Sequence, residues 1–302
     1  MALNQQTVMV TGAAGMLAGD LIPRLLRGGW RVQLFDLKQS EVAGCLVAAL
    51  DITSFKDVSN AVSDVSPEWL INCAAYTQVD AAESNEQAAF AVNGSGAGNL
   101  ARALSDVGGK MLHISTDYVF GGPDGCSARR TPYLPEDKPD PCGVYGKSKH
   151  LGEVEVVEAL PESHLVLRTS WLHGIHGHNF VNTMLKLAKE RTELSVVDDQ
   201  VGSPTWAGWL AEVMVELIEK DARGTFHATS RGGISWLDFA REIFRVAGAE
   251  VELKGQTTEE LGREAPRPRY STLDVGKLES LLGRQCITWQ EGVARHLEAL
   301  RA

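Results

Sequence analysis

The chain has 302 residues, of which 44% are hydrophobic and 23% charged, a composition that is ordinary for a globular protein and excludes a disordered or fibrous one. Lys and Arg number 29 against 39 Asp and Glu, and the resulting net charge of −10 opposes binding to nucleic acid or to an anionic membrane surface. This length allows one large or two modest domains.

Five cysteines, an odd number without CxxC spacing, are expected to be reduced thiols, which favours a cytoplasmic location. The first residues, MALNQQTVMV, lead into an apolar run after a short polar stretch. We expect neither a signal peptide nor a membrane span.

Short apolar runs alternate with helix-length amphipathic stretches through the first half of the chain. Strands are predicted at Thr7–Thr11, Arg31–Phe35, Trp69–Cys73, Met111–Ser115 and His164–Arg168. Parallel strands joined by helices predict an α/β fold, a Rossmann-type doubly wound parallel sheet, in residues 1–170.

The alternation of strands and helices breaks in the second half. A long irregular loop is expected from Gly121 to Pro141, and loops of this length are usually functional or disordered. Beyond it, a helix is predicted at Asn179–Arg191, a strand at Leu194–Val197, a helix at Ala207–Lys220 and a last helix after Trp289. Residues 171–302 are therefore expected to form mainly a smaller α/β cap domain that binds the substrate, with some segments returning to the first domain.

A glycine-rich turn follows the first predicted strand. Gly12 permits the tight turn, Gly15 lets a pyrophosphate approach the backbone, and the small Ala18 lets the next helix pack against the strand. The turn predicts a dinucleotide site; the alternative is a glycine turn without a ligand.

Two acidic residues follow at positions suited to the adenosine half of such a cofactor. Asp36 ends the second strand, where a carboxylate accepts from ribose hydroxyls and favours NADH, while the nearby Lys38 keeps NADPH possible. Asp51 and Ile52 stand where a third loop would reach the adenine. A cap for the following helix is an equally good interpretation of Asp51.

Tyr145 and Lys149 are spaced so that both side chains lie on one face of a helix. A cation beside a phenol favours the phenolate, so the pair predicts a proton donor with a lowered pKa. Thr116 ends a predicted buried strand, where open α/β sheets bind ligands, and can donate to a carbonyl. The alternative is that Thr116 only caps the exit of the chain from the sheet.

Six blocks along the chain carry a specific resemblance. They are Asn72–Asp80, Ser115–Phe120, Val144–Lys149, Arg168–Trp171, Asp199–Thr205 and Arg267–Asp274. In this order they resemble the dTDP-4-dehydrorhamnose reductase family, which belongs to the extended short-chain dehydrogenase/reductases.

The resemblance implies reduction of the C4 ketone of dTDP-4-dehydro-L-rhamnose by NADPH or NADH. Tyr145 would protonate the nascent alkoxide, Lys149 would hold the nicotinamide ribose and lower the tyrosine pKa, and Thr116 would polarise the carbonyl. The cofactor would also meet Gly15, Met16, Leu17, Asp36, Asp51, Ile52, Cys73, Ala74 and Ala75, and the sugar nucleotide would meet Thr116, Asp117 and Trp171.

A tryptophan and two arginines are candidates for contact with the substrate, and each also has a purely structural interpretation. Trp171 offers a flat apolar wall and one N–H donor to a deoxysugar, or is simply part of the core. Arg267 or Arg269 could hold the nucleotide diphosphate by bidentate contact, with Arg269 favoured, or could belong to a solvated basic loop.

No functional metal is expected. Some members of the family form a magnesium-bridged dimer through three acidic positions, and here these positions hold Asp20, Gly208 and Ala299, so only one carboxylate remains. A monomer or a metal-independent homodimer is therefore predicted. The cluster His173, His176 and His178 could bind a transition metal, but a flexible polar loop is the favoured interpretation.

Two rival functions remain open at the level of sequence. One is reduction of a different 4-keto sugar nucleotide or a different product stereochemistry. The other is a non-catalytic, cofactor-binding regulatory subunit, because the β subunit of methionine adenosyltransferase shares this expected fold.

Overall fold

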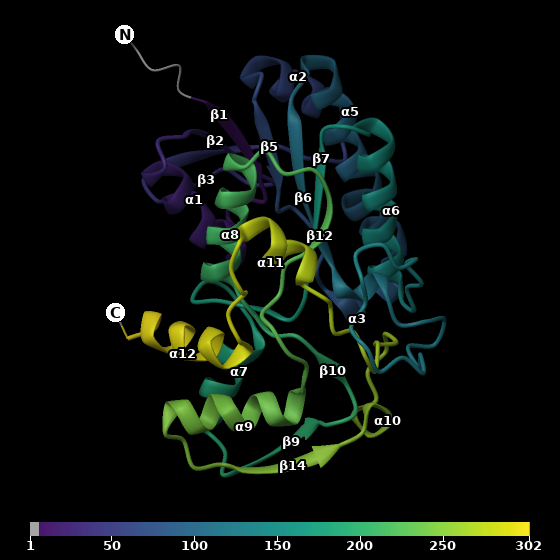
Figure 1. Cartoon of the computed structure of the whole chain (residues 1–302), viewed down its shortest axis with the longest axis vertical. Coiled ribbons are helices and arrows are strands. Elements are labelled where there is room, and N and C mark those ends of the chain that lie inside the picture. The colour runs from purple at the N-terminus through teal and green to yellow at the C-terminus, as the bar shows by residue number, and fades with distance from the viewer. Residues whose placement is uncertain (1–5, 302) are drawn as a thin grey trace.

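A computed structural model describes residues 6–301 and contains an eight-stranded sheet in the order β12-β7-β6-β5-β1-β2-β4-β3 (Figure 1). Every neighbouring pair is parallel except β3 with β4. The strands are β1 (Thr7–Thr11), β2 (Arg31–Asp36), β3 (Ser40–Val42), β4 (Cys45–Ala49), β5 (Trp69–Asn72), β6 (Lys110–Thr116), β7 (His164–Thr169) and β12 (Gly224–His227). The predicted doubly wound α/β fold is confirmed.

Helices cover both faces of this sheet because alternate residues of its strands point to opposite sides. Val8 and Val10 of β1 belong to one apolar core, and Met9 between them belongs to the other. The first core is completed by α1 (Met16–Arg27), α8 (Ala207–Glu219) and α11 (Gly276–Leu282). The second is completed by α2 (Phe55–Val65), α5 (Ala97–Val107) and α6 (Val144–Ala159).

Short helices, turns and a loop follow the strands β5 and β6 at the edge of the sheet where these strands end. After β5 come α3 (Val79–Ser84), α4 (Glu86–Phe90) and a π-helical turn, η1 (Ala91–Gly96), that runs into α5. A 3₁₀ turn, η2 (Asp117–Val119), follows β6. Residues 121–141 contain no helix or regular strand, and a bridge between Gly121 and Pro141 joins the ends of this predicted loop.

A smaller lobe lies below the sheet in Figure 1 and has its own apolar core. It contains α7 (Phe180–Leu187), α9 (Trp236–Ala247), α10 (Thr258–Leu261), α12 (Trp289–Ala299) and the parallel pair β9 (Glu193–Val197) and β14 (Glu252–Gln256). Two short ladders are formed by β8 (Leu172–His173) with β11 (Thr205–Trp206) and by β10 (Val201–Gly202) with β13 (Ile234–Ser235).

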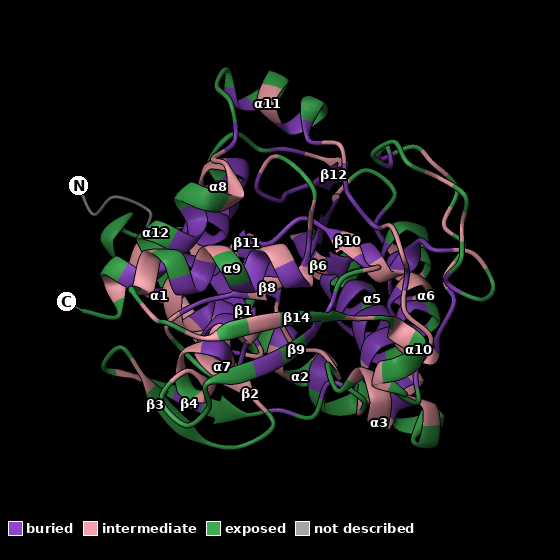
Figure 2. Cartoon of the chain, turned by 90° about the horizontal axis from the view of Figure 1, so that it is seen from below, coloured by how far each residue is buried: buried purple, intermediate pink, exposed green. Residues whose placement is uncertain are grey.

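The chain returns to the large sheet after it has entered the lobe. The helix predicted at 207–220 is α8, which packs against α1, and β12 adds a strand beside β7. Figure 2 shows the buried strands of the sheet inside the molecule, whereas β14 is largely exposed. Within residues 6–301, none of the helices is long and apolar enough to cross a membrane.

Candidate active site

A cavity of about 1040 Å³ opens where the parallel strands of the large sheet end. Carboxyl ends of parallel strands meet at one edge, so residues far apart in sequence converge there. The cavity is lined at these ends by Thr11 of β1, Asp36 of β2, Cys73 after β5, Thr116 of β6 and Thr169 of β7. The predicted cofactor-binding turn and the predicted catalytic residues therefore line the same cavity.

The glycine turn forms a cradle that a side chain would fill. Gly12 has a φ of +72°, and a Cβ on it would lie 2.5 Å from the backbone nitrogen of Ala74. α1 starts after Gly15 without a side-chain cap and without an acidic residue in its first turn, and its first residues line the cavity. These features fit the pyrophosphate of a dinucleotide.

The two acidic residues expected at the adenosine half both line the cavity and also organise the backbone. Asp36 accepts from the N–H groups of Ala14 (3.0 Å) and Leu37 (2.7 Å), which ties the end of β2 to the glycine turn. Asp51 accepts from both the N–H (2.9 Å) and the hydroxyl (2.7 Å) of Thr53. The cap of α2 itself is Ser54, so Asp51 shapes the turn before the helix while its neighbour Ile52 faces the cavity.

The other predicted cofactor residues, Met16, Leu17, Cys73, Ala74 and Ala75, line the cavity as well. Burial raises the pKa of the Cys73 thiol to about 12, so this cysteine is a neutral apolar wall at physiological pH.

Tyr145 and Lys149 lie one turn apart near the start of α6, and together with Thr116 they line the cavity. The ammonium of Lys149 is 2% exposed and donates to the carbonyl oxygen of Ile114 at 2.6 Å. The ring of Tyr145 meets Tyr118 edge to face, with centroids 5.5 Å apart. These contacts fix the phenol and the ammonium at the cavity.

The expected lowering of the Tyr145 pKa is not what the structure shows. Burial raises this pKa to about 12, and a hydrogen-bonding interaction with Thr116 opposes the rise, but Lys149 contributes nothing to it. Burial also lowers the pKa of Lys149 to about 8, against an opposing contribution from Glu153. The correction has a physical reason, because the cation is directed to a backbone carbonyl instead of the phenol.

Thr116 and Asp117 form one hydrogen-bonded unit behind the cavity wall. The Thr116 hydroxyl donates to Asp117 at 3.1 Å and accepts from the Tyr118 N–H at 3.2 Å, and the Ser271 hydroxyl donates to the other carboxylate oxygen at 2.5 Å. Asp117 is 1% exposed and is not among the residues that line the cavity. Its expected contact with the sugar stays a prediction; in this structure the hydrogen bond from Thr116 links it to the cavity wall.

Burial raises the pKa of Asp117 to about 6, while hydrogen bonds from Ser271 and Thr116 lower it. A group with this pKa carries its charge at neutral pH. The single hydroxyl proton of Thr116 is thus directed to a carboxylate, and a substrate carbonyl has to compete with Asp117 for it.

Trp171 lines the cavity from a strained backbone position, with a φ of +44°. Its indole is stacked on that of Trp236 with centroids 3.5 Å apart and planes 7° from parallel. Gly202 lies against the same ring, since a Cβ there would be 2.4 Å from Cε2 of Trp171. The predicted flat wall is therefore largely covered by protein, and only the remaining part of the ring reaches the cavity.

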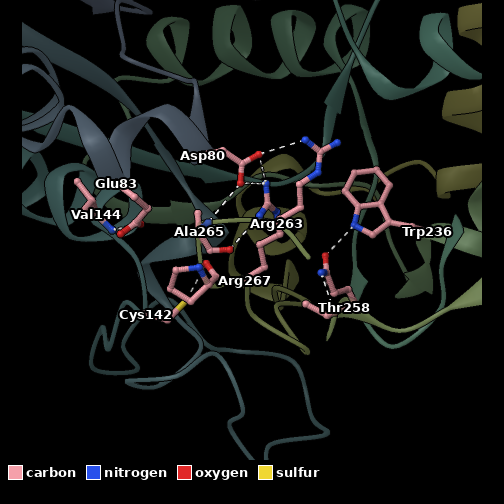
Figure 3. A network of polar contacts seen from close by, with 11 residues as sticks. Asp80, Glu83, Cys142, Val144, Trp236, Thr258, Arg263, Ala265 and Arg267 are labelled. Carbon is pink, nitrogen blue, oxygen red and sulfur yellow. Dashed lines mark hydrogen bonds and ion pairs between the residues drawn. The ribbon is translucent and has the colours of Figure 1, made fainter. Parts of the chain in front are cut away.

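The two arginines considered for the diphosphate do not line the cavity. Arg267 donates to Asp80 of α3 at 2.9 Å and Arg263 lies 3.5 Å from the same carboxylate, as Figure 3 shows. Arg269 pairs instead with Glu259 of α10. The expected contact of Arg269 with the substrate stays a prediction, and in this structure each arginine pairs with an acidic neighbour.

The network in Figure 3 also reaches the catalytic helix. Glu83 of α3 accepts from the N–H of Val144 at 2.9 Å, so a carboxylate from another helix caps the start of α6. Gly143 precedes the helix and offers no side-chain cap of its own. A negative charge at a helix N-terminus is stabilising, and here it fixes the turn that carries Tyr145.

The predicted histidine cluster does not assemble. His173 is buried against His296, with 2.9 Å between their Nδ1 atoms, His176 packs against Gly19, and His178 lines the cavity and contacts the Thr183 hydroxyl at 3.2 Å. In the described part of the chain, no group of three or more His, Cys, Asp or Glu could hold a metal ion. The prediction of a metal-independent protein stays a prediction.

Several residues that line the cavity belong to blocks noticed in the sequence, although their side chains were not assigned a role; they are Tyr76, Thr77, Gln78, Thr169 and Ser170. Trp236 supports the cavity residue Trp171 and was not singled out, because its role depends on a contact with a residue distant in sequence.

The protein-family model described as the RmlD substrate binding domain matches residues 6–302. A dTDP-4-dehydrorhamnose reductase of Streptomyces griseus is 38% identical over 97% of this chain and 93% of its own length. A dTDP-4-keto-6-deoxy-D-glucose reductase of Streptomyces niveus is 40% identical over 88% of this chain and 87% of its own length.

The solved structure of a dTDP-4-dehydrorhamnose reductase from Bacillus anthracis, in complex with NADP, matches with a TM-score of 0.89 and 39% identity. The alignment covers 98% of this chain and 99% of that one. The resemblance carried by the six sequence blocks is thereby confirmed, and the chain belongs to the dTDP-4-dehydrorhamnose reductase family.

Proposed function

We propose that the protein reduces the C4 ketone of dTDP-4-dehydro-L-rhamnose to dTDP-L-rhamnose with NADPH or NADH. The observation that carries this proposal is the cavity itself, which joins the glycine cradle at Gly12 to Thr116, Tyr145 and Lys149 in one space. A dinucleotide in the cradle and a sugar near Tyr145 can therefore meet.

Reduction of a ketone needs a hydride at carbon and a proton at oxygen. The reduced nicotinamide supplies the hydride. Tyr145 holds the proton and gives it to O4 of the sugar as the C–O bond becomes an alkoxide, which a raised pKa favours by keeping the phenol protonated. Lys149 lies one turn away on the same face of α6 and would hold the nicotinamide ribose, as the family resemblance implies.

Thr116 supports the same oxygen. Its hydroxyl is fixed by Asp117 and by the Tyr118 N–H, so it stands at the cavity wall in one orientation. When its proton turns from Asp117 to the developing O4 anion, it stabilises the charge that forms in the transition state.

Both nicotinamide cofactors remain part of the proposal. The Bacillus anthracis relative is in complex with NADP, which supports NADPH. The carboxylate of Asp36 accepts hydrogen bonds from two backbone N–H groups, which weakens its repulsion of the 2′-phosphate of NADPH. Asp36 also lines the cavity, where it can accept hydrogen bonds from the ribose hydroxyls of NADH.

A second candidate substrate is a dTDP-4-keto-6-deoxysugar of another configuration. The specific observation in its favour is the Streptomyces niveus relative, whose name gives dTDP-4-keto-6-deoxy-D-glucose as the substrate at 40% identity to this chain. The cavity residues alone favour a 4-keto sugar and do not choose its configuration.

The test is turnover. Purified protein is mixed with NADPH and, in parallel, with dTDP-4-dehydro-L-rhamnose and dTDP-4-keto-6-deoxy-D-glucose, and the absorbance of the reduced cofactor is followed. We expect rapid oxidation with the first sugar and much slower oxidation with the second. Oxidation with neither sugar, together with co-purification of another enzyme, would favour the regulatory-subunit alternative.

The proposal includes a cytoplasmic location and a monomer or metal-independent homodimer. All five cysteines are free, as expected of a reducing compartment. Light scattering in excess EDTA and in excess Mg²⁺ checks the second point, and equal masses under both conditions are expected.

A further inference from the structure

Three charged side chains, one of them Lys149 of the catalytic pair, are buried on α6 and β7. Lys149 is 2% exposed, Glu153 5% and Arg168 4%. Lys149 and Glu153 are four residues apart on α6 and therefore share a face of that helix, and Arg168 reaches them from β7. Charges this deeply buried are costly unless they neutralise one another, so the arrangement of the three decides which of them keep their charge.

Arg168 fixes the carboxylate of Glu153 by a bidentate contact. Its Nε donates to Oε1 at 2.8 Å and its Nη2 to Oε2 at 2.7 Å, and its Nη1 donates to the carbonyl oxygen of Pro135 at 3.1 Å. Burial raises the pKa of Glu153, but the hydrogen bonds of Arg168 and His150 and the charge of Arg168 outweigh burial and hold the pKa at about 2. Glu153 is consequently an anion throughout the working pH range.

Lys149 makes no hydrogen bond to this carboxylate. Its ammonium donates to the carbonyl oxygen of Ile114, a neutral partner, so its positive charge is compensated through space. Glu153 is the main group that raises the Lys149 pKa against the effect of burial, and Cys73 contributes less. Removal of the Glu153 charge would leave two buried cations, Lys149 and Arg168, with no anion in the cluster.

We propose that Glu153 is a positioning residue that keeps Lys149 charged: anchored by Arg168, it is the buried counter-ion of the catalytic lysine one helical turn away. The effect on turnover rests on the proposed reductase function. The effect on cofactor binding does not, because it requires only that Lys149 faces the bound dinucleotide in the cavity that it lines.

The other titratable groups around the cluster do not provide this charge. From β6, His113 faces Lys149 and Glu153, and burial holds its pKa well below the usual value. From β12, His227 lies 3.4 Å from Arg168, and burial lowers its pKa to about 3. Cys73 and Tyr145 have pKa values raised to about 12 by burial. All four are neutral near pH 8, where Lys149 loses its proton.

His150 of α6 is the remaining titratable neighbour. Its Nδ1 lies 3.6 Å from a carboxylate oxygen of Glu153, and its side chain is one-third exposed. It faces Glu153 from the solvent side of the helix, so its substitution by alanine is a control for loss of a polar neighbour without loss of the buried anion.

The experiment measures the dissociation constant of NADPH between pH 6 and pH 10 by quenching of tryptophan fluorescence. In the unaltered protein, affinity should weaken above about pH 8 as Lys149 loses its charge. In Glu153→Gln the pH at which half of this affinity is lost, the midpoint, should fall by about one pH unit or more, because an opposite charge at short range usually shifts a pKa by that amount. Affinity should therefore recover when the pH is lowered. In His150→Ala the midpoint should not move.

Two further variants keep the test decisive if the unpaired Arg168 prevents Glu153→Gln from folding. The double variant Glu153→Gln, Arg168→Gln removes both charges, and its midpoint should lie between those of Glu153→Gln and the unaltered protein. Glu153→Asp keeps the charge, and its midpoint should stay within about half a pH unit of the original. This order of midpoints is expected if the charge of residue 153 controls Lys149, and it is not expected if the substitutions only disturb packing.

The same midpoints should appear in the alkaline limb of kcat/KM for the sugar nucleotide. A midpoint in Glu153→Gln and in the double variant equal to that of the unaltered protein would overturn the role of Glu153, even if the enzyme turns over normally. Absence of turnover in the unaltered protein, with the shifted binding midpoints present, would instead contradict the proposed function and leave the role of Glu153 supported.

Discussion

Trp171 is stacked on Trp236 with its backbone in the left-handed region, and the two indole planes are 7° from parallel. Trp236 starts α9 in the smaller lobe, and its Nε1 donates to Gln200 at 3.2 Å. Gln200 in turn donates to Thr258, which Figure 3 shows beside Trp236. The orientation of a cavity residue is therefore set by the lobe.

Replacement of Trp236 by alanine should weaken binding of the sugar nucleotide. A stacked aromatic pair contributes about 0.5–1.5 kcal/mol, so KM for the sugar should rise about twofold to tenfold. The dissociation constant of NADPH should stay within about twofold, because Trp236 is not among the residues lining the cavity. Trp236→Phe should retain most of the affinity, and equal KM values in all three proteins would show that the stack has no role in substrate binding.

Gly12→Ala should abolish tight cofactor binding, because the methyl group would lie 2.5 Å from the nitrogen of Ala74 and would also occupy the cradle. Gly108→Ala is a matched control. Gly108 has the same φ of +72°, and a Cβ there would meet nothing within 4 Å.

Both variants should lose about 1–2 kcal/mol of stability from the strained backbone. Only Gly12→Ala should lose further stability and weaken NADPH binding, by about a hundredfold, as measured by titration calorimetry. Equal NADPH affinities in the two variants would exclude the cradle as the pyrophosphate site.

Tyr145→Phe should lower kcat by about 10²–10⁴-fold, the usual contribution of a positioned general acid, with little change in the dissociation constant of NADPH. Tyr118→Phe is the control, because the ring of Tyr118 packs edge to face against Tyr145 but does not line the cavity. Its kcat should stay within about threefold of the original. If both variants were equally slow, the loss would reflect packing of the pair and Tyr145 would not be assigned as the acid.

Asp117→Asn should stabilise the protein at neutral pH. The folded pKa of Asp117, about 6, lies above the unfolded value near 3.9, so the folded state binds more protons between these values and its stability falls as the pH rises through this window. The variant has no such charge to bury.

Urea unfolding should therefore show Asp117→Asn more stable than the original by about 1–3 kcal/mol at pH 8, with a smaller difference at pH 5. A variant that is less stable at pH 8 would show that the hydrogen bonds of the ionised carboxylate outweigh its burial.

Five of the eight strands of the main sheet and the glycine turn were predictable because apolar runs, glycine spacing and strand ends are local patterns. The strands β3, β4 and β12 were not predicted. Of these, β12 is short and pairs with β7 only after the chain has passed through the smaller lobe. The six sequence blocks predicted many of the residues that line the cavity but not the residues with which they form contacts.

Long-range contacts explain what the sequence did not reveal. Arg269 was expected at the substrate, but its acidic neighbour Glu259 competes for it. Lys149 was expected to lower the Tyr145 pKa, but the carbonyl of Ile114 takes its hydrogen bond and burial dominates. The Trp171–Trp236 stack and the contact of Arg168 with Glu153 each join residues whose proximity no local pattern encodes.

The most direct measurement of the proposed reaction follows a labelled hydride. The protein is incubated with dTDP-4-dehydro-L-rhamnose and NADPH that carries deuterium at both hydrogen positions of C4 of the nicotinamide, and the product is examined by NMR. We expect dTDP-L-rhamnose with deuterium at C4 of the sugar, formed by the unaltered protein and at least a hundredfold more slowly by Tyr145→Phe. Cofactor oxidation without deuterium at C4, or a ketone that remains unreduced, would contradict the proposed function.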